Sequence, residues 1–140
     1  MRVMPFAVAA ALSLTGFGIS AAHAAPATQN EQKSCGTEVC TVVFPTVPAG
    51  QTQAWTNLSC NTTAANAVYY IVSKYTASGK QVPYAWVPVT TTSNGFSIIN
   101  TPIGGVFAAG EYATVAAITS SAPTGGKVIL KCAATWNATP

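Results

Sequence analysis

Four cysteines that follow an apolar N-terminal segment constrain this chain more than any other feature. Residues 1–24 predict an export signal, because Arg2 supplies a positive charge, an apolar stretch follows, and Ala22-His23-Ala24 has the pattern that signal peptidase recognises. A membrane anchor is the alternative reading, but the segment is short and no basic stop follows it. We expect cleavage before Ala25, no membrane or lipid anchor afterwards, and a periplasmic or extracellular location.

An exported chain meets oxidising conditions, so its cysteines are expected to pair. Cys35, Cys40, Cys60 and Cys132 allow three connectivities. The spacing favours Cys35–Cys40, within a short turn, together with Cys60–Cys132. Alternation along the early and the last strand places Cys60 and Cys132 on core-facing sides, where they can meet across the core. A zinc site is the alternative, but the spacing is wrong and no histidine remains after cleavage. We therefore expect two disulfides, no metal and no cofactor.

Short runs of β-branched and aromatic residues alternate with breaks of Gly, Pro, Asn and Ser over residues 35–140. This spacing is typical of a β-sandwich, and no helical periodicity interrupts it. We expect an all-β domain over 35–140, an Ig-like Greek-key sandwich of about seven strands, after a flexible polar tail over 25–34. The predicted strands are Glu38–Phe44, Gln51–Cys60, Ala67–Tyr75, Gln81–Val89, Phe96–Asn100, Glu111–Thr119 and Lys127–Trp136.

One local motif supports the sandwich. The six residues from Phe107 to Tyr112, with Gly110 two positions before the tyrosine, resemble the tyrosine corner of Greek-key sandwiches. That resemblance implies that the Tyr112 hydroxyl bonds to upstream backbone and fixes a crossover between sheets. A glycine-led strand start with a buried tyrosine is the simpler alternative. On the last strand, Trp136 shares the core-facing side with Cys132.

The residues that remain after cleavage exclude most catalytic chemistry. They contain no His, Asp or Arg, so a Ser-His-Asp or Cys-His site is excluded. Glu38 and Glu111 form the only glutamate pair outside the tail, and no motif supports it. Ser73 and Lys74 are neighbours on a strand and point to opposite faces. Five lysines and three glutamates leave a net charge of +2 without a basic stripe, so we expect no nucleic-acid partner and no enzyme.

Aromatic residues are the remaining source of binding chemistry. Tyr84 and Trp86 share one face of Gln81–Val89, a strand whose two prolines predict an edge position. Trp55 points away from Cys60 and is a second exposed candidate. Packing of these rings under a neighbouring loop is the alternative. We expect an exported, non-catalytic module that binds a glycan or a host or cell-surface protein. The alternative function is a structural subunit of a surface fibre, a pilus-like structure or a biofilm matrix, assembled through an edge strand.

Overall fold

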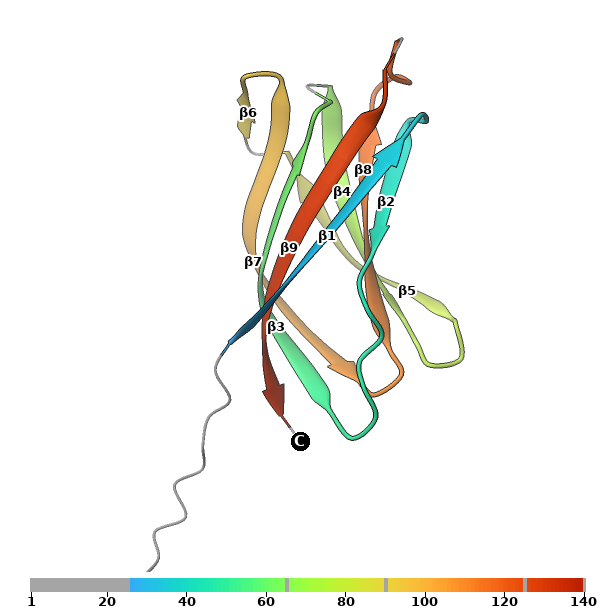
Figure 1. Ribbon diagram of the computed structural model, residues 1–140, viewed down its shortest axis with the longest axis vertical. Helices are drawn as coiled ribbons and strands as arrows, with labels where there is room; N and C mark the ends of the chain where they lie inside the picture. The colour runs from blue at the N-terminus through green and yellow to red at the C-terminus, as the bar shows by residue number, and fades with distance from the viewer. Residues whose placement is uncertain (1–25, 65, 90, 125, 140) are drawn as a thin grey trace, which may run out of the picture.

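The computed structural model describes residues 26–64, 66–89, 91–124 and 126–139, so the predicted export signal lies outside the described residues. The described chain forms nine strands (Figure 1). Their bounds are β1 Ala27–Cys35, β2 Val39–Val43, β3 Thr52–Thr62, β4 Ala67–Tyr75, β5 Gln81–Pro88, β6 Thr91–Ser93, β7 Phe96–Ala108, β8 Tyr112–Thr119 and β9 Val128–Thr139.

The strands form two antiparallel sheets that pack face to face. The five-stranded sheet has the order β1-β9-β3-β7-β6, and the four-stranded sheet has the order β2-β8-β4-β5. Consecutive strands alternate between the sheets, except at the pairs β4–β5 and β6–β7. Leaving aside the short β6, this is the order of an eight-stranded jelly roll, in which strands far apart in sequence become neighbours.

The prediction of an all-β sandwich with two disulfides is confirmed, but the Ig-like Greek-key arrangement is not. An Ig sandwich places several consecutive strands side by side in one sheet. Here β1, β2, β3 and β4 alternate between the two sheets, so each connection crosses the sandwich. Strand positions are set by local residue patterns, whereas strand order depends on long-range pairing that those patterns do not encode.

The polar tail predicted over residues 25–34 is wrong for nearly all of its length, because Ala27–Cys35 forms β1. This strand pairs antiparallel with β9 over nine positions, from Ala27 opposite Trp136 to Cys35 opposite Val128. Most of its side chains are exposed. Backbone hydrogen bonds therefore hold the strand, and because it buries few side chains it has no apolar alternation that sequence analysis could detect.

Residues 101–110 were predicted as a break between strands, but β7 continues through them to Ala108. Its alternation buries Ile99, Ile103 and Phe107 against the core. Pro102 is tolerated because β6 pairs only with the first residues of β7, which leaves the rest of β7 at the sheet edge. The β6–β7 hairpin turns at Asn94-Gly95, both with positive φ, as a two-residue turn requires.

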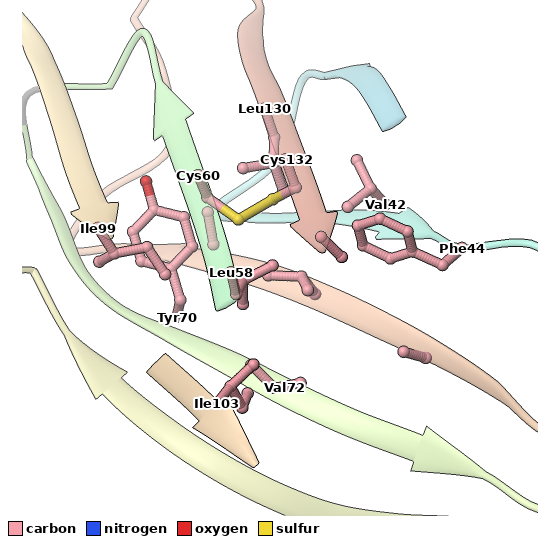
Figure 2. Close-up of a cluster of buried hydrophobic side chains, with 14 of the residues drawn as sticks. Val42, Phe44, Leu58, Cys60, Tyr70, Val72, Ile99, Ile103, Leu130 and Cys132 are labelled. Carbon is pink, nitrogen blue, oxygen red and sulfur yellow. A yellow bond between two sulfur atoms is a disulfide. The ribbon is translucent and has the colours of Figure 1, made fainter. Parts of the chain in front are cut away.

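The core lies between the sheets and is closed by apolar side chains from both (Figure 2). Tyr70 on β4 is fully buried, and its hydroxyl donates a 2.8 Å hydrogen bond to the Ser97 carbonyl on β7. The Ser97 hydroxyl in turn donates to the Ala64 carbonyl at 2.7 Å. Burial raises the pKa of Tyr70 far above its ordinary value. This buried chain of polar groups links the two sheets without leaving a polar atom unpaired.

Both predicted disulfides are present. Cys35–Cys40 joins the end of β1 to the start of β2 and so links the edges of the two sheets. Cys60 and Cys132 are direct register partners on β3 and β9, with Cα atoms 4.1 Å apart. The prediction that this bridge spans the core is therefore wrong, because it joins neighbouring strands of the five-stranded sheet (Figure 2).

Candidate functional site

The outward side chains of the four-stranded sheet form a surface that we call the aromatic face. They alternate along each strand with core residues such as Val42, Tyr70, Val72 and Val115. Register pairing aligns them in rows across β2, β8, β4 and β5. The face comprises Val39, Thr41, Val43, Tyr69, Ile71, Ser73, Tyr75, Trp86, Tyr112, Thr114, Ala116 and Ile118, of which Ser73 and Thr114 are buried by their neighbours.

Trp86 is the most exposed large apolar side chain of the described residues, with 63% of its surface accessible. It lies opposite Ile71 in register, and its ring centroid is 4.8 Å from that of Tyr69. Tyr75 and Tyr112 form a second ring pair, stacked at 4.8 Å and 5°. Of the two arrangements that the sequence left open for Trp86, the structure shows the exposed one. Tyr69, its ring partner, was not among the candidate site residues.

Tyr84 lies in β5, but its side chain is outside the part of the chain that the structure describes. Its backbone occupies the register shift of the β4–β5 pair, where Ala85 pairs with Val72 and Pro83 with Ser73. Tyr84 is therefore the extra residue of a bulge. The prediction placed Tyr84 beside Trp86 because side chains two residues apart on a regular strand point to the same face. The bulge interrupts this alternation at Tyr84, so the sequence spacing alone does not put the two rings together.

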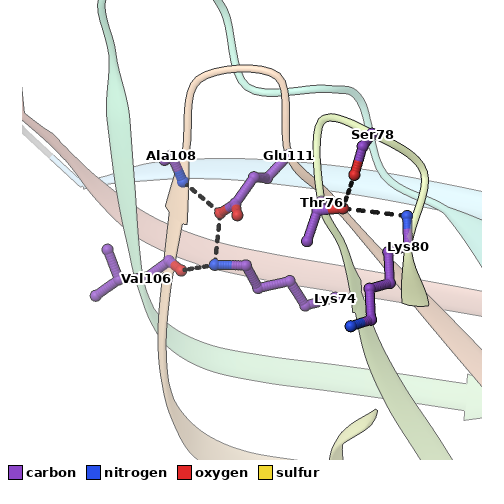
Figure 3. A network of polar contacts seen from close by, with 7 residues as sticks. All are labelled: Lys74, Thr76, Ser78, Lys80, Val106, Ala108 and Glu111. Carbon is purple, nitrogen blue, oxygen red and sulfur yellow. Dashed lines mark hydrogen bonds and ion pairs between the residues drawn. The ribbon is translucent and has the colours of Figure 1, made fainter. Parts of the chain in front are cut away.

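The aromatic face carries no charged side chain on its described residues. Lys74, the one lysine within β4, points inward and bonds to the Val106 carbonyl at 3.0 Å and to Glu111 (Figure 3). Its ammonium also lies 5.6 Å from the centre of the Phe107 ring. Ser73 points the other way and accepts a 3.0 Å hydrogen bond from Gln81. The two neighbours therefore do not form a dyad, as their strand parity predicted.

Glu111 is the last residue of the short connection between β7 and β8. Partial burial raises the pKa of its carboxyl. The hydrogen bonds from Lys74 and from the Ala108 amide, together with the positive charge of Lys74, lower the pKa by more than burial raises it, so the pKa lies below its usual range. The Ala108 amide donates to the carboxylate at 2.7 Å. Glu111 is therefore a turn-stabilising group, engaged in an ion pair with Lys74 of β4, the strand next to β8 in the same sheet.

The tyrosine-corner motif takes a different form from the one its resemblance implied. Gly110 has φ +82°, and a Cβ at this position would lie 3.0 Å from the Ala77 side chain, so glycine is required. The Tyr112 ring stacks on Tyr75 at the surface. The hydrogen bond predicted for its hydroxyl is not among those of the described residues, where the buried Tyr70 hydroxyl links the sheets instead.

Trp55 is 4% exposed, so its predicted exposure is wrong. The register shifts between Trp55 and Asn57 in both pairings of β3, and this bulge inverts the alternation counted back from Cys60. The Trp55 ring packs within 4.9 Å of Phe44 and Phe107 and is stacked at 6.2 Å with the partly buried Trp136. Together with Gln29, Pro48 and Gln53, the rings of Phe44, Trp55 and Trp136 line a cleft of about 200 Å³.

The outward side chains of the five-stranded sheet form the polar face. Asn57 donates a 3.0 Å hydrogen bond to Asn100 across β3 and β7, and Ser59 and Asn61 line a shallow hollow with Lys131. Members of the face are Thr28, Asn30, Gln32, Asn57, Ser59, Asn61, Asn100, Lys131 and Thr135. Phe96 and Val106, at the two ends of β7, are the exposed large apolar residues on this side of the sheet, and the rest of it resembles an ordinary solvated sheet face.

Two kinds of site are not found in the described chain. No group of three or more His, Cys, Asp or Glu side chains in residues 26–64, 66–89, 91–124 and 126–139 is arranged to hold a metal ion. Within the same residues no helix is long and apolar enough to cross a membrane.

No protein-family model matches this chain, and no curated protein matches it either. Three solved structures are similar at low levels. The core of Drosophila NLP, whose structure concerns pentamer formation and histone binding, is 16% identical with a TM-score of 0.34, covering 79% of this chain and 98% of its own. The exo-β-1,3-galactanase of Phanerochaete chrysosporium is 14% identical with a TM-score of 0.39, covering 79% of this chain and 29% of the enzyme.

The third structure is the extra small virus particle of the prawn Macrobrachium rosenbergii. It is 10% identical with a TM-score of 0.24, over 96% of this chain and 95% of the viral one. All three TM-scores are below 0.5, so none of these likenesses carries an argument about the fold or function of this chain.

Proposed function

We propose that this protein is an exported, non-catalytic recognition module that binds the surface of another protein through the aromatic face. The leader and the two disulfides support export. One observation carries the binding proposal: the aromatic face is uncharged and places a Trp86 ring that is 63% exposed against Tyr69. Contiguous exposed apolar surface of this kind marks interaction sites in soluble proteins.

A protein partner fits this face better than a glycan does. Depletion of charge with enrichment of Trp and Tyr is the composition of protein-interface centres. A glycan site needs polar groups that converge on the sugar hydroxyls around the aromatic ring. Beside Trp86, the row across the sheet instead supplies Ile71 and Ala116. Their flat, apolar surface offers shape and burial, with few hydrogen bonds. The polar pair of the next row, Ser73 and Thr114, is buried, and Ser73 already accepts a hydrogen bond from Gln81.

The test measures binding of the labelled, oxidised protein to intact cells. Trp86→Ala should reduce binding roughly 30-fold or more, the loss typical of an interface hot spot. Asn100→Ala on the polar face is the matched control and should bind like the wild type. Protease treatment of the cells should abolish binding, whereas glycosidase treatment should not. Unchanged binding by Trp86→Ala would refute the proposed site, and loss after glycosidase treatment alone would assign a glycan.

A structural or assembly role is a second candidate function. It is favoured by the free edge of β1, which ends the five-stranded sheet without a further strand in the described chain. Unpaired edges are the surfaces through which β proteins add strands to one another.

A further inference from the structure

The free edge of β1 differs from the other edges of the two sheets. It offers nine residues, Ala27–Cys35, with no proline among them and with most side chains exposed. The edge strand β5 contains Pro83 and Pro88 and a bulge, and β2 has only five residues. Prolines, bulges and short length are the features that protect sheet edges from further pairing, and β1 has none of them.

The edge formed by β7 is also protected. β6 covers its first residues, Pro102 lacks an amide hydrogen, and the Lys74 ammonium donates to the Val106 carbonyl at 3.0 Å. An incoming strand would have to displace that lysine. Among the described edges, β1 is therefore the one most open to a new strand.

The charged residues of β1 favour pairing with a second copy of β1 in one particular register. Glu31 and Lys33 are two residues apart, so their side chains lie on the same side of the strand. Neither belongs to an ion pair among the described residues, where Lys74–Glu111 is the one salt bridge. If two copies of β1 pair antiparallel about a two-fold axis at Gln32, Glu31 of each copy lies opposite Lys33 of the other. An axis at Glu31 or at Lys33 would instead bring like charges together.

We propose that the protein forms a two-fold symmetric dimer by antiparallel pairing of β1 with β1 of a second copy, centred on Gln32. A two-fold interface requires one surface to be complementary to itself, and the Glu31/Lys33 pattern meets this condition in one register. The dimer joins the two five-stranded sheets into one continuous sheet. It leaves the aromatic face uncovered, and it does not rest on the proposed function of that face.

Charge reversal tests the register. Glu31→Lys or Lys33→Glu turns both cross-strand attractions into repulsions, so each single variant should dimerise at least about tenfold more weakly in sedimentation equilibrium. The double variant Glu31→Lys/Lys33→Glu restores complementarity and should recover the wild-type affinity. Lys80→Glu, in the exposed turn between β4 and β5, is the control for net charge and should dimerise normally.

Cross-linking tests the axis directly. In antiparallel pairs, opposite Cα atoms are about 4.5–5.5 Å apart, within the range that a disulfide spans. Gln32→Cys should therefore form a covalent dimer under mild oxidation, whereas Thr28→Cys, far from its own symmetry mate, should not. A wild-type protein that is monomeric at every concentration overturns the proposal. So does a dimer insensitive to the single reversals, or one in which Gln32→Cys cross-links no better than Thr28→Cys. Far-UV circular dichroism confirms that each variant is folded.

Discussion

The two sheets of this protein turn opposite surfaces to solvent. The five-stranded sheet presents mainly Asn, Gln, Ser and Thr side chains, several of them joined by hydrogen bonds such as Asn57–Asn100 and Thr28–Thr135. Its exposed large apolar residues, Phe96 and Val106, both lie on β7. The four-stranded sheet presents valines, isoleucines and aromatic rings, with Trp86 the most exposed. Both sheets share one core, so the difference does not arise from the fold. An antiparallel sheet that packs on one side usually keeps its other side polar, which makes the aromatic face the exception.

The two sheets also differ in their disulfide bonds. Cys60–Cys132 joins two neighbouring strands inside the five-stranded sheet, whereas no disulfide lies within the described four-stranded sheet. Neighbouring apolar side chains on the aromatic face, such as Ile71 beside Trp86, partly bury one another. The comparison indicates that one sheet is stabilised in part by a cross-link and the other in part by contacts on both of its faces.

Among the changes that test this comparison, removal of a disulfide is expected to lower the free energy of unfolding most. Cys60→Ala/Cys132→Ala opens a link between residues 72 apart and should lower the free energy of unfolding by about 4 kcal/mol. Cys35→Ala/Cys40→Ala opens a link between residues five apart and should cost about 2 kcal/mol. Urea denaturation of the two double variants measures both values. Equal losses would show that chain entropy does not set the contribution of each bridge.

A lysine placed on each face tests the difference between the faces themselves. Ile71→Lys on the aromatic face removes a half-buried apolar side chain between Ala116 and Trp86, and should destabilise by roughly 1–2 kcal/mol. Ser59→Lys on the polar face should change stability by less than about 0.5 kcal/mol. Urea unfolding midpoints at equal slope give the comparison. Similar losses at both sites would mean that the aromatic face contributes nothing to stability.

The smallest expected effect concerns the ion pair between Lys74 of β4 and Glu111, the residue before β8. Because the folded-state pKa of Glu111 is lowered, its contribution is fully present above the ordinary carboxyl pKa of about 4.3 and is lost as pH falls through the folded value. Wild-type unfolding midpoints should therefore decrease between pH 6 and pH 3 by more than those of Glu111→Gln. Glu38→Gln, at an exposed site, is the control. Parallel profiles for wild type and Glu111→Gln would contradict the assignment.

Sequence analysis located the elements well wherever strands bury one side. Ala67–Tyr75 was predicted with its observed bounds, and most of the other strands differ only at their ends. The strand predictions failed where a strand shows no regular alternation of buried apolar and exposed polar residues. β1 is held by backbone pairing with exposed side chains, and β7 continues through Pro102 because it lies at an edge. In the candidate site, the sequence named Trp86 as a candidate but left its exposure open, while the bulge in β3 reversed the prediction for Trp55.

The sequence alone determined the strand-rich character of the chain, and it favoured, among three possible connectivities, the cysteine pairing that the structure shows. Alternation and turn residues act over a few positions, and even numbers of exported cysteines pair in few ways. Only the tertiary structure decided the jelly-roll order, the location of the Cys60–Cys132 bridge within one sheet, and the partnership of Tyr69 with Trp86. These features depend on which distant strands become neighbours. A single bulge, which no local sequence pattern marks, is enough to turn the following side chains from the core face of a strand to its solvent face.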